Sequence, residues 1–182
     1  MDKPNQSPRR LYYGHIVLHK LGNLWLAWNV SAIAHIAWSE ADTRRNAALI
    51  DPATEFTASE VPEPYCSLLN KYSRGEAVEP ARLPVTLVGT AFQQKVWRAL
   101  RDIPRGEVRS YGQIASIVGS PGAARAVGTA CRVNRIPIVV PCHRVVASGS
   151  RLGGYSGGIE RKIALLELER LPGRPRLAIR AD

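Results

Sequence analysis

The chain has 182 residues, of which 45% are hydrophobic and 22% are charged, a composition typical of a globular protein. Its three cysteines are too few for a disulfide scaffold and lack the paired spacing of a zinc site, so we expect free thiols, no metal and a reducing, cytoplasmic environment. Residues 1–10 lack the apolar core of a secretory signal, and polar side chains interrupt the best membrane candidate, residues 24–38, so we expect no membrane segment.

The basic residues are concentrated in the second half of the chain. Residues 1–88 hold nine Lys or Arg and nine Asp or Glu, whereas residues 89–182 hold sixteen against six, which produces the net charge of +10. A basic half beside a neutral half is typical of a polyanion-binding domain attached to a scaffold. A solvated basic surface without a partner is the alternative at this point.

The first half of the chain predicts a small sheet followed by a helix. Three segments rich in β-branched and aromatic side chains predict strands: residues 12–19, 24–28 and 33–38. Residues 41–62 show little periodicity and are expected to form a loop. Residues 64–73 predict a helix with Pro64 at its start and Gly75 just beyond its end. Nothing in this half points to chemistry, so its expected role is structural.

The second half begins with an amphipathic helix. Thr90 and Gln93 form a capping box, and Pro104 ends the helix. Apolar side chains recur between them at helical spacing: Phe92, Val96, Leu100 and Ile103.

Two short helices follow, over residues 111–118 and 120–133. The first opens with a second capping box, Ser110 with Gln113, and ends at Gly119. Two such helices joined by a glycine-containing turn form a helix-turn-helix candidate. Small side chains fill the second helix, and three arginines lie on it or just after it: Arg125, Arg132 and Arg135. The coincident positive charge favours DNA binding over simple packing.

The stretch Pro141-Cys142-His143-Arg144 places a single thiol between two apolar segments, residues 136–140 and Val145-Val146, which predict buried extended chain. Apolar burial raises the pKa of a thiol, so reactivity requires a stabilising neighbour, and His143 and Arg144 are candidates. Neighbours on an extended chain point to opposite faces, so we expect His143 to act through water, with a third group orienting its imidazole. A buried structural cysteine is the alternative.

A glycine-rich segment, residues 153–158, precedes a last helix over residues 159–170, with Ile163 and Leu166 on its expected core face. Such a loop can present backbone N–H groups to an anion or to a base edge. It matches neither a Walker loop nor the dinucleotide fingerprint.

In order along the chain, these motifs resemble the O6-alkylguanine-DNA alkyltransferase family, or methylated-DNA–protein-cysteine methyltransferases. The centre of the resemblance is Pro141-Cys142-His143-Arg144-Val145, with Asn134 before it. Further matching motifs are residues 89–97, 110–113, 124–128 and 155–158. The match covers residues 88–170, and before them only the strand-turn-strand outline agrees.

The resemblance implies an α/β protein of two domains. A small sheet-plus-helix domain of the ribonuclease-H-like type would take residues 1–88. A mostly helical domain of the winged-helix or helix-turn-helix type would take residues 89–170, and residues 171–182 would form a basic tail. The implied partner is double-stranded DNA that contains O6-alkylguanine, with O4-alkylthymine as a second substrate. The protein would act as a cytoplasmic monomer without a cofactor.

The resemblance also implies irreversible transfer of an alkyl group from guanine O6 to Cys142. His143 would deprotonate the thiol through a bound water, and Glu169 would orient His143. Asn134 would be the hinge between the recognition helix and the active-site segment. Tyr111 would crowd the DNA phosphate, help to rotate the base out of the stack and protonate the leaving guanine.

The remaining implied residues contact DNA or the flipped base. Arg125 would fill the vacated place in the base stack, with further DNA contacts from Ala124, Arg132 and Arg135. Six residues would line the alkylguanine pocket: Cys131, Pro137, Val145, Tyr155, Ser156 and Gly157. Arg135 stands where many relatives carry proline, and Cys131 occupies a pocket position that often holds another apolar residue, which leaves the size of the pocket open.

Two other classes of function remain as alternatives. A non-catalytic helix-turn-helix protein that binds lesions is the second reading, although such relatives replace the cysteine that is present here as Cys142. A cysteine hydrolase is the third, and it is disfavoured because Cys142 and His143 are adjacent and no glycine-rich nucleophile elbow surrounds them.

Overall fold

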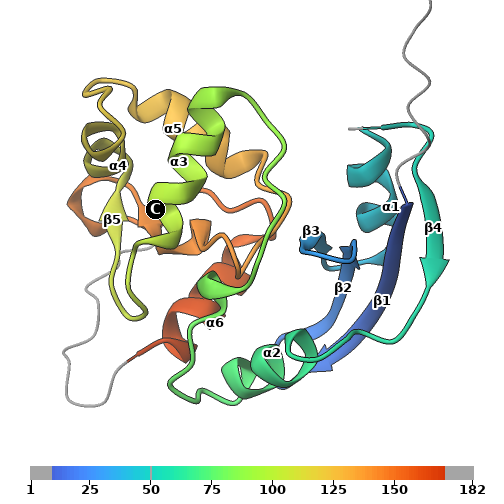
Figure 1. Ribbon diagram of the computed structural model, residues 1–182. Coiled ribbons are helices and arrows are strands. Elements are labelled where there is room, and N and C mark those ends of the chain that lie inside the picture. The colour runs from blue at the N-terminus through green and yellow to red at the C-terminus, as the bar shows by residue number, and fades with distance from the viewer. Residues whose placement is uncertain (1–9, 50, 171–182) are drawn as a thin grey trace, which may run out of the picture.

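The structure, a computed structural model, describes residues 10–49 and 51–170, which fold into a sheet lobe and a helical lobe that lie side by side (Figure 1). The sheet lobe contains β1 (Arg10–Leu18), β2 (Gly22–Trp28), β3 (Ile33–Ala37), α1 (Glu40–Ala48), β4 (Glu55–Ala58), α2 (Tyr65–Ser73) and the 3-10 helix η1 (Pro80–Arg82). The helical lobe contains α3 (Ala91–Arg101), β5 (Arg109–Ser110), α4 (Tyr111–Ile117), α5 (Ala124–Arg132), η2 (Cys142–Arg144), β6 (Val145–Val146), η3 (Ser148–Ser150) and α6 (Ile159–Leu168). The chain is thus a mixed α/β protein, as predicted.

The sheet has the strand order β3-β2-β1-β4. β2 pairs antiparallel with β1 and β3, whereas β4 pairs parallel with β1. The turn between β1 and β2 uses the left-handed backbone region, with φ of 61° at Lys20 and 78° at Gly22. The three predicted strands are confirmed to within two residues at each end, and the helix predicted over residues 64–73 is confirmed as α2.

The prediction of a loop over residues 41–62 is wrong, because α1 and β4 lie there. The Ser39 hydroxyl caps α1 by accepting a hydrogen bond from the Asp42 amide at 3.1 Å. This helix buries only Thr43 and Ala47, so its sequence carries no apolar periodicity. β4 is only four residues long and depends on pairing with β1, a contact between distant parts of the chain.

Both predicted capping boxes are confirmed in the helical lobe. At α3 the Thr90 hydroxyl accepts from the Gln93 amide at 3.2 Å, and the Gln93 side chain accepts from the Thr90 amide at 2.9 Å. Ser110 and Gln113 form the same pair of bonds at the start of α4. Local side-chain chemistry therefore decides where these two helices begin.

Two other helices differ from the prediction in detail. α5 begins at Ala124 rather than near Ser120, because residues 120–123 form a turn. In α6, Leu166 is buried as predicted, but Ile163 is 38% exposed, so its expected core position is wrong. The helix is rotated so that other side chains face the core beside Leu166: Lys162 and Leu165.

The segment after α5 is buried, as predicted, but it is not extended. Residues 136–140 form turns, with Ile138 at φ of 72°. Cys142–Arg144 forms a 3-10 turn, so Cys142 and His143 do not follow the alternation of an extended chain. The extended segment resumes at β6, which pairs parallel with β5.

One hydrophobic core runs through both lobes. Leu26 of β2, Leu69 of α2, Leu100 of α3 and Val127 of α5 belong to it and are fully buried. Within the described ranges, no helix is both long and apolar enough to cross a membrane.

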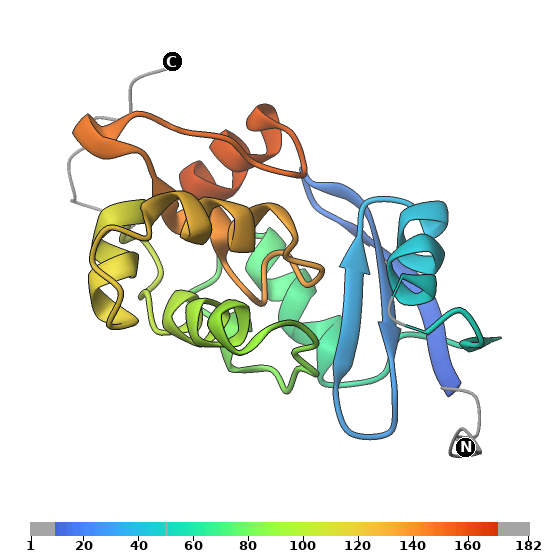
Figure 2. The same cartoon turned by 90° about the horizontal axis from the view of Figure 1, so that it is seen from above.

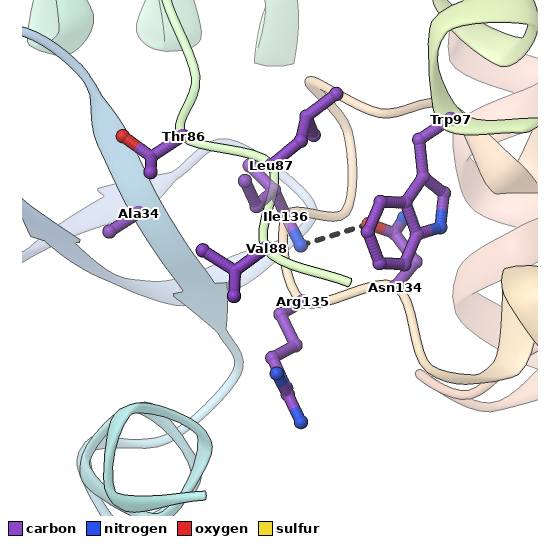
Figure 3. A pocket seen from close by; sticks show the side chains of 8 residues that line it. All are labelled: Ala34, Thr86, Leu87, Val88, Trp97, Asn134, Arg135 and Ile136. Atoms are coloured by element: carbon purple, nitrogen blue, oxygen red, sulfur yellow. Dashed lines mark hydrogen bonds between the residues drawn. The ribbon is translucent and has the colours of Figure 1, made fainter. Parts of the chain in front are cut away.

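β3 lies at the seam between the lobes. The Ile36 amide donates to the Arg135 carbonyl at 2.8 Å, and the Ile33 amide donates to the Pro84 carbonyl at 3.0 Å. Figure 3 shows this seam, where Ala34 and Val88 lie beside the segment that contains Asn134, around a cavity of about 10 Å³. The chain before α3 and the chain just after α5 therefore cover the edge of the sheet at β3.

Replacing Leu100 with alanine should lower the free energy of unfolding by about 2–5 kcal/mol, because it leaves a cavity in the shared core. Ile117→Ala is the control, since Ile117 is 60% exposed and its loss should cost at most about 0.5 kcal/mol. Urea denaturation measures both values. An equal loss in the two variants would contradict the position of Leu100 in the core.

Candidate active site

The segment between α5 and β6 is folded around the side chain of Asn134. Its Nδ2 donates to the Val140 carbonyl at 2.8 Å and to Cys142 Sγ at 3.1 Å. Its Oδ1 accepts from the Ile136 amide at 3.0 Å (Figure 3). One side chain therefore closes the turn after α5 and holds the sulfur at the same time.

The Cys142 thiol is buried, with 3% of the residue exposed. Burial raises the pKa of Cys142, whereas the hydrogen bond from Asn134 and the positive charge of Lys162 act in the opposite direction. Arg144 was a predicted stabiliser of the sulfur, but its guanidinium binds Glu79 and Glu169 instead. The resting side chain is a thiol, and it needs a base in order to react.

His143 is fully buried and pairs with Glu169, with 2.9 Å between His143 Nε2 and Glu169 Oε1. An ionised carboxylate at this distance favours the tautomer with the proton on Nε2, which leaves Nδ1 as the acceptor. Nδ1 is buried and has no hydrogen-bond partner among the described residues. The imidazole can therefore accept a proton at Nδ1 while Glu169 stabilises the positive charge.

Glu169 caps the C-terminus of α6 and is 1% exposed. Its Oε1 accepts from the Tyr72 hydroxyl at 2.7 Å and from Arg144 Nη2 at 2.8 Å, in addition to His143. Its Oε2 accepts from Arg144 Nε at 2.9 Å. Burial acts to raise the pKa of Glu169, but His143 and Arg144 outweigh it and hold the pKa well below its usual range. Glu169 is therefore an anion at neutral pH.

Lys162 of α6 is completely buried and donates to backbone carbonyls on two segments. Its Nζ binds the carbonyls of Val145 at 2.6 Å, Gly154 at 3.4 Å, and Leu152. These bonds tie β6, next to the cysteine, to the glycine-rich loop before α6. Lys162 therefore places a positive charge near the Cys142 thiol while the thiol stays shielded from water.

Cys142 lies in the wall of a pocket of about 340 Å³ between α4, α5 and the loop before α6. Eight residues line the pocket: Tyr111, Gly128, Cys131, Arg132, Cys142, Gly154, Tyr155 and Ser156. The Tyr155 hydroxyl is buried without a hydrogen-bond partner in the part of the chain that the structure describes. Burial, with the nearby Cys142, raises the pKa of Tyr155, so its hydroxyl remains a potential donor.

The predicted pocket residues divide into two groups. The structure places Cys131, Tyr155 and Ser156 in the pocket of Cys142. It places the other three outside this pocket: Val145, Pro137 and Gly157. Val145 is fully buried in β6, where its carbonyl binds Lys162. Pro137 and Gly157 line a neighbouring pocket of about 350 Å³, which shares Arg132 and Ser156 with the first.

Most of the predicted DNA-contacting residues lie on α5 or just after it, and Tyr111 lies at the start of α4. Arg125 and Arg132 are exposed, whereas Ala124 and Arg135 are partly buried. Figure 2 shows α4 at the end of the helical lobe furthest from the sheet, with α5 running back toward the sheet. The two helices pack against each other at Gly128, where an added Cβ atom would meet the Tyr111 ring at 3.8 Å, an ordinary van der Waals distance. The helix pair thus presents positive charge beside the pocket.

Sequence reasoning missed Tyr72, Glu79 and Lys162, which all belong to the network around Cys142 and His143. For Lys162 a signal existed, because it occupies a core-facing position one turn before Leu166 on an amphipathic helix. Tyr72 and Glu79 carried none, since each meets its partner across more than sixty residues of chain.

Comparisons with known proteins show which family this chain is similar to. The model of the family described as "6-O-methylguanine DNA methyltransferase, DNA binding domain" matches residues 91–171. The methylated-DNA–protein-cysteine methyltransferase of Mycobacterium leprae is 57% identical over 104 residues, which is 57% of this chain and 62% of that protein. The chain thus spans less than two thirds of that relative.

Two further matches extend into the first half of the chain. The methylated-DNA–protein-cysteine methyltransferase of Shigella flexneri is 39% identical over 155 residues, which covers 82% of this chain and 90% of that protein. The crystal structure of Mycobacterium tuberculosis OGT in complex with DNA superposes with a TM-score of 0.72 at 41% identity, over 87% of this chain and 92% of that one.

Glu169→Gln should lower the free energy of unfolding by about 3–5 kcal/mol at neutral pH, because it leaves the buried Arg144 without its full charge partner. The folded-state pKa of Glu169 lies below the unfolded value of about 4.3, so the carboxylate stabilises the fold above that pH and loses this effect as the pH falls. The difference in the free energy of unfolding between wild type and Glu169→Gln should therefore become smaller as the pH falls into the acid range.

Urea denaturation as a function of pH measures this difference. Glu167→Gln is the matched control, because Glu167 is an exposed carboxylate on the same helix, and the change should have little effect. A difference between wild type and Glu169→Gln that does not depend on pH would contradict the assigned charge state of Glu169.

Proposed function

The chain belongs to the 6-O-methylguanine DNA methyltransferase family, and we propose that it repairs DNA by transferring an alkyl group from guanine O6 to its own Cys142. The observation that carries the proposal is the buried thiol of Cys142 in a pocket wall, held by Asn134 and followed by the His143–Glu169 pair. A thiol without a base is a poor nucleophile, and this pair supplies the base.

The proposed transfer is a direct displacement at the alkyl carbon. His143 Nδ1 takes the thiol proton through a bound water, and Glu169 stabilises the imidazolium. The Cys142 thiolate then forms the S–C bond as the C–O6 bond of guanine breaks. Tyr111, which lines the same pocket, donates a proton to the leaving guanine and recovers it from solvent. The product is a thioether, which nothing in the pocket can displace, so each chain acts once.

The pocket supports base flipping, because chemistry on O6 requires the guanine to leave the stack. Tyr111 crowds the phosphate and rotates the nucleotide, and Arg125, exposed on α5, fills the vacated place. Cys131, Tyr155 and Ser156 contact the flipped base in the pocket. The partner is therefore double-stranded DNA with O6-alkylguanine, and O4-alkylthymine is a second substrate of the same geometry.

Phosphate contacts supply most of the affinity in this proposal. Arg132 is the last residue of α5 and Arg135 follows three residues later, while Ala124 allows close approach of the backbone at the other end. Asn134 joins this helix to the segment of the cysteine, so it acts as the hinge between DNA binding and chemistry. The M. tuberculosis structure in complex with DNA supports DNA as the partner.

We also infer the finer architecture. The order β3-β2-β1-β4, with β4 parallel to β1, supports a ribonuclease-H-like domain over residues 1–88. The pair α4 and α5 beside the small β5-β6 sheet supports a winged-helix or helix-turn-helix domain over residues 89–170. The predicted basic tail, residues 171–182, lies outside the described residues. The protein is proposed to act as a cytoplasmic monomer without a cofactor.

Cys142→Ala should abolish transfer and leave DNA binding largely intact, because phosphate contacts rather than the thiol supply the affinity. The protein is incubated with methylated duplex DNA and weighed intact, and wild type should gain one methylene per chain. Cys66→Ala is the matched control, since Cys66 is a free cysteine on α2 outside the pocket, and it should transfer normally.

The outcomes separate the candidate functions. Tight binding of the lesion without any gain of mass in the wild type would favour a non-catalytic lesion-binding protein. Full transfer by Cys142→Ala would end the assignment of the acceptor, and multiple turnovers per chain would contradict the thioether product.

Arg125→Ala should slow transfer from duplex DNA roughly ten- to thousandfold, because unstacking costs a few kcal/mol and each ~1.4 kcal/mol is a factor of ten. Transfer from a free alkylated base should change little, since no gap in a stack needs filling. Single-turnover rates on both substrates measure the effect, with Arg98→Ala on the exposed face of α3 as the control. Equal slowing on both substrates would contradict this role of Arg125.

A further inference from the structure

The sheet lobe contributes one side chain to the network behind the cysteine. Tyr72 of α2 has no exposed surface, and its hydroxyl donates to Glu169 Oε1 at 2.7 Å. Figure 1 shows α2 lying next to α6, the helix that ends at Glu169. The contact joins residues 97 positions apart.

The carboxylate oxygen that Tyr72 binds is the one that faces the catalytic histidine. Oε1 of Glu169 accepts from Tyr72, from His143 Nε2 at 2.9 Å and from Arg144 Nη2 at 2.8 Å. Hydrogen bonds to an ionised acceptor are short and stronger than neutral ones. Tyr72 therefore acts on the orientation of Glu169 and on the share of its negative charge that His143 receives.

The Tyr72 hydroxyl is itself held in place by packing. The Arg105 guanidinium lies over the Tyr72 ring at 5.4 Å. Arg105 also donates to the carbonyls of Leu168 at 2.8 Å, Glu76 at 2.6 Å and Gly75 at 3.1 Å, which ties the end of α6 to the end of α2. Burial and the charge of Glu169 raise the pKa of Tyr72, so the phenol stays protonated and remains a donor.

We propose that Tyr72 is a positioning residue for alkyl transfer, which orients Glu169 and limits the negative charge that Glu169 presents to His143. This inference rests on the proposed function. Groups that orient a catalytic partner from behind commonly set its geometry and basicity. The sheet lobe is therefore part of the catalytic apparatus, whereas the sequence predicted only a structural role for it.

Loss of the Tyr72 hydroxyl has two expected effects. Glu169 loses one of its restraints, so transfer slows. More of the charge on Oε1 then faces His143 and stabilises its imidazolium form, so the acid limb of the transfer rate moves upward in pH. Other titratable or charged side chains among the described residues face the His143–Glu169 pair, directly or through a neighbour: Cys142, Arg144, Tyr155, Glu79, Lys162 and Arg105.

The test compares Tyr72→Phe with Tyr65→Phe in the full chain. Tyr65 lies on the same helix and is also buried, but within the described part of the chain it is Tyr72 and not Tyr65 that donates to Glu169. Single-turnover transfer from methylated duplex DNA is followed across pH, and the Kd for duplex DNA and the melting temperature are measured alongside. Tyr72→Phe should transfer about tenfold more slowly, or about 1.4 kcal/mol, with an unchanged Kd and an acid limb shifted upward. Tyr65→Phe should behave as wild type.

A second variant covers the case in which Tyr72→Phe fails to fold. Replacing Tyr72 with 3-fluorotyrosine keeps the ring and makes the phenol a stronger donor, so the acid limb should shift downward. A wild-type rate and pH profile in Tyr72→Phe would overturn the proposal, as would an acid limb that the fluorinated variant leaves in place. A fall in rate matched by an equal loss of DNA affinity would also overturn it. Absence of transfer in the wild type would instead refute the proposed function.

Discussion

A single buried anion, the Glu169 carboxylate, holds the active site together. His143, Arg144 and Tyr72 all bind it, and Arg144 carries the network on to Glu79. Removing one partner of such a network leaves an uncompensated buried charge, so the arrangement tolerates little change. The same carboxylate that stabilises the fold also fixes the tautomer of the histidine that would act as the base.

Burial and reactivity have opposite requirements at the Cys142 thiol. Burial raises the pKa of Cys142, which keeps the sulfur protonated in the resting protein. Asn134 and Lys162 offset part of this effect, and His143 is the base that we propose for the thiol proton. A thiol that is buried and protonated in this way is less reactive toward electrophiles in solution than an exposed thiolate.

The contacts between the sheet lobe and the helical lobe do not support a division into one purely structural lobe and one purely catalytic lobe. The hydrophobic core is continuous, β3 bonds to the chain just after α5, and α2 reaches the carboxylate behind His143. A disturbance of the sheet lobe can therefore reach the active site through packed side chains and through the hydrogen bond of Tyr72.

The features that depend on neighbouring residues could be predicted from the sequence. The two capping boxes, the core face of α3 and the Pro141–Arg144 motif are local, so their chemistry could be seen in the order of the residues. The other features depend on contacts between distant parts of the chain. β4 exists only through pairing with β1, Ile138 takes a left-handed conformation inside a packed turn, and Tyr72 meets Glu169 across 97 residues. These contacts arise when distant segments bury their surfaces together, and no pattern of adjacent residues encodes them.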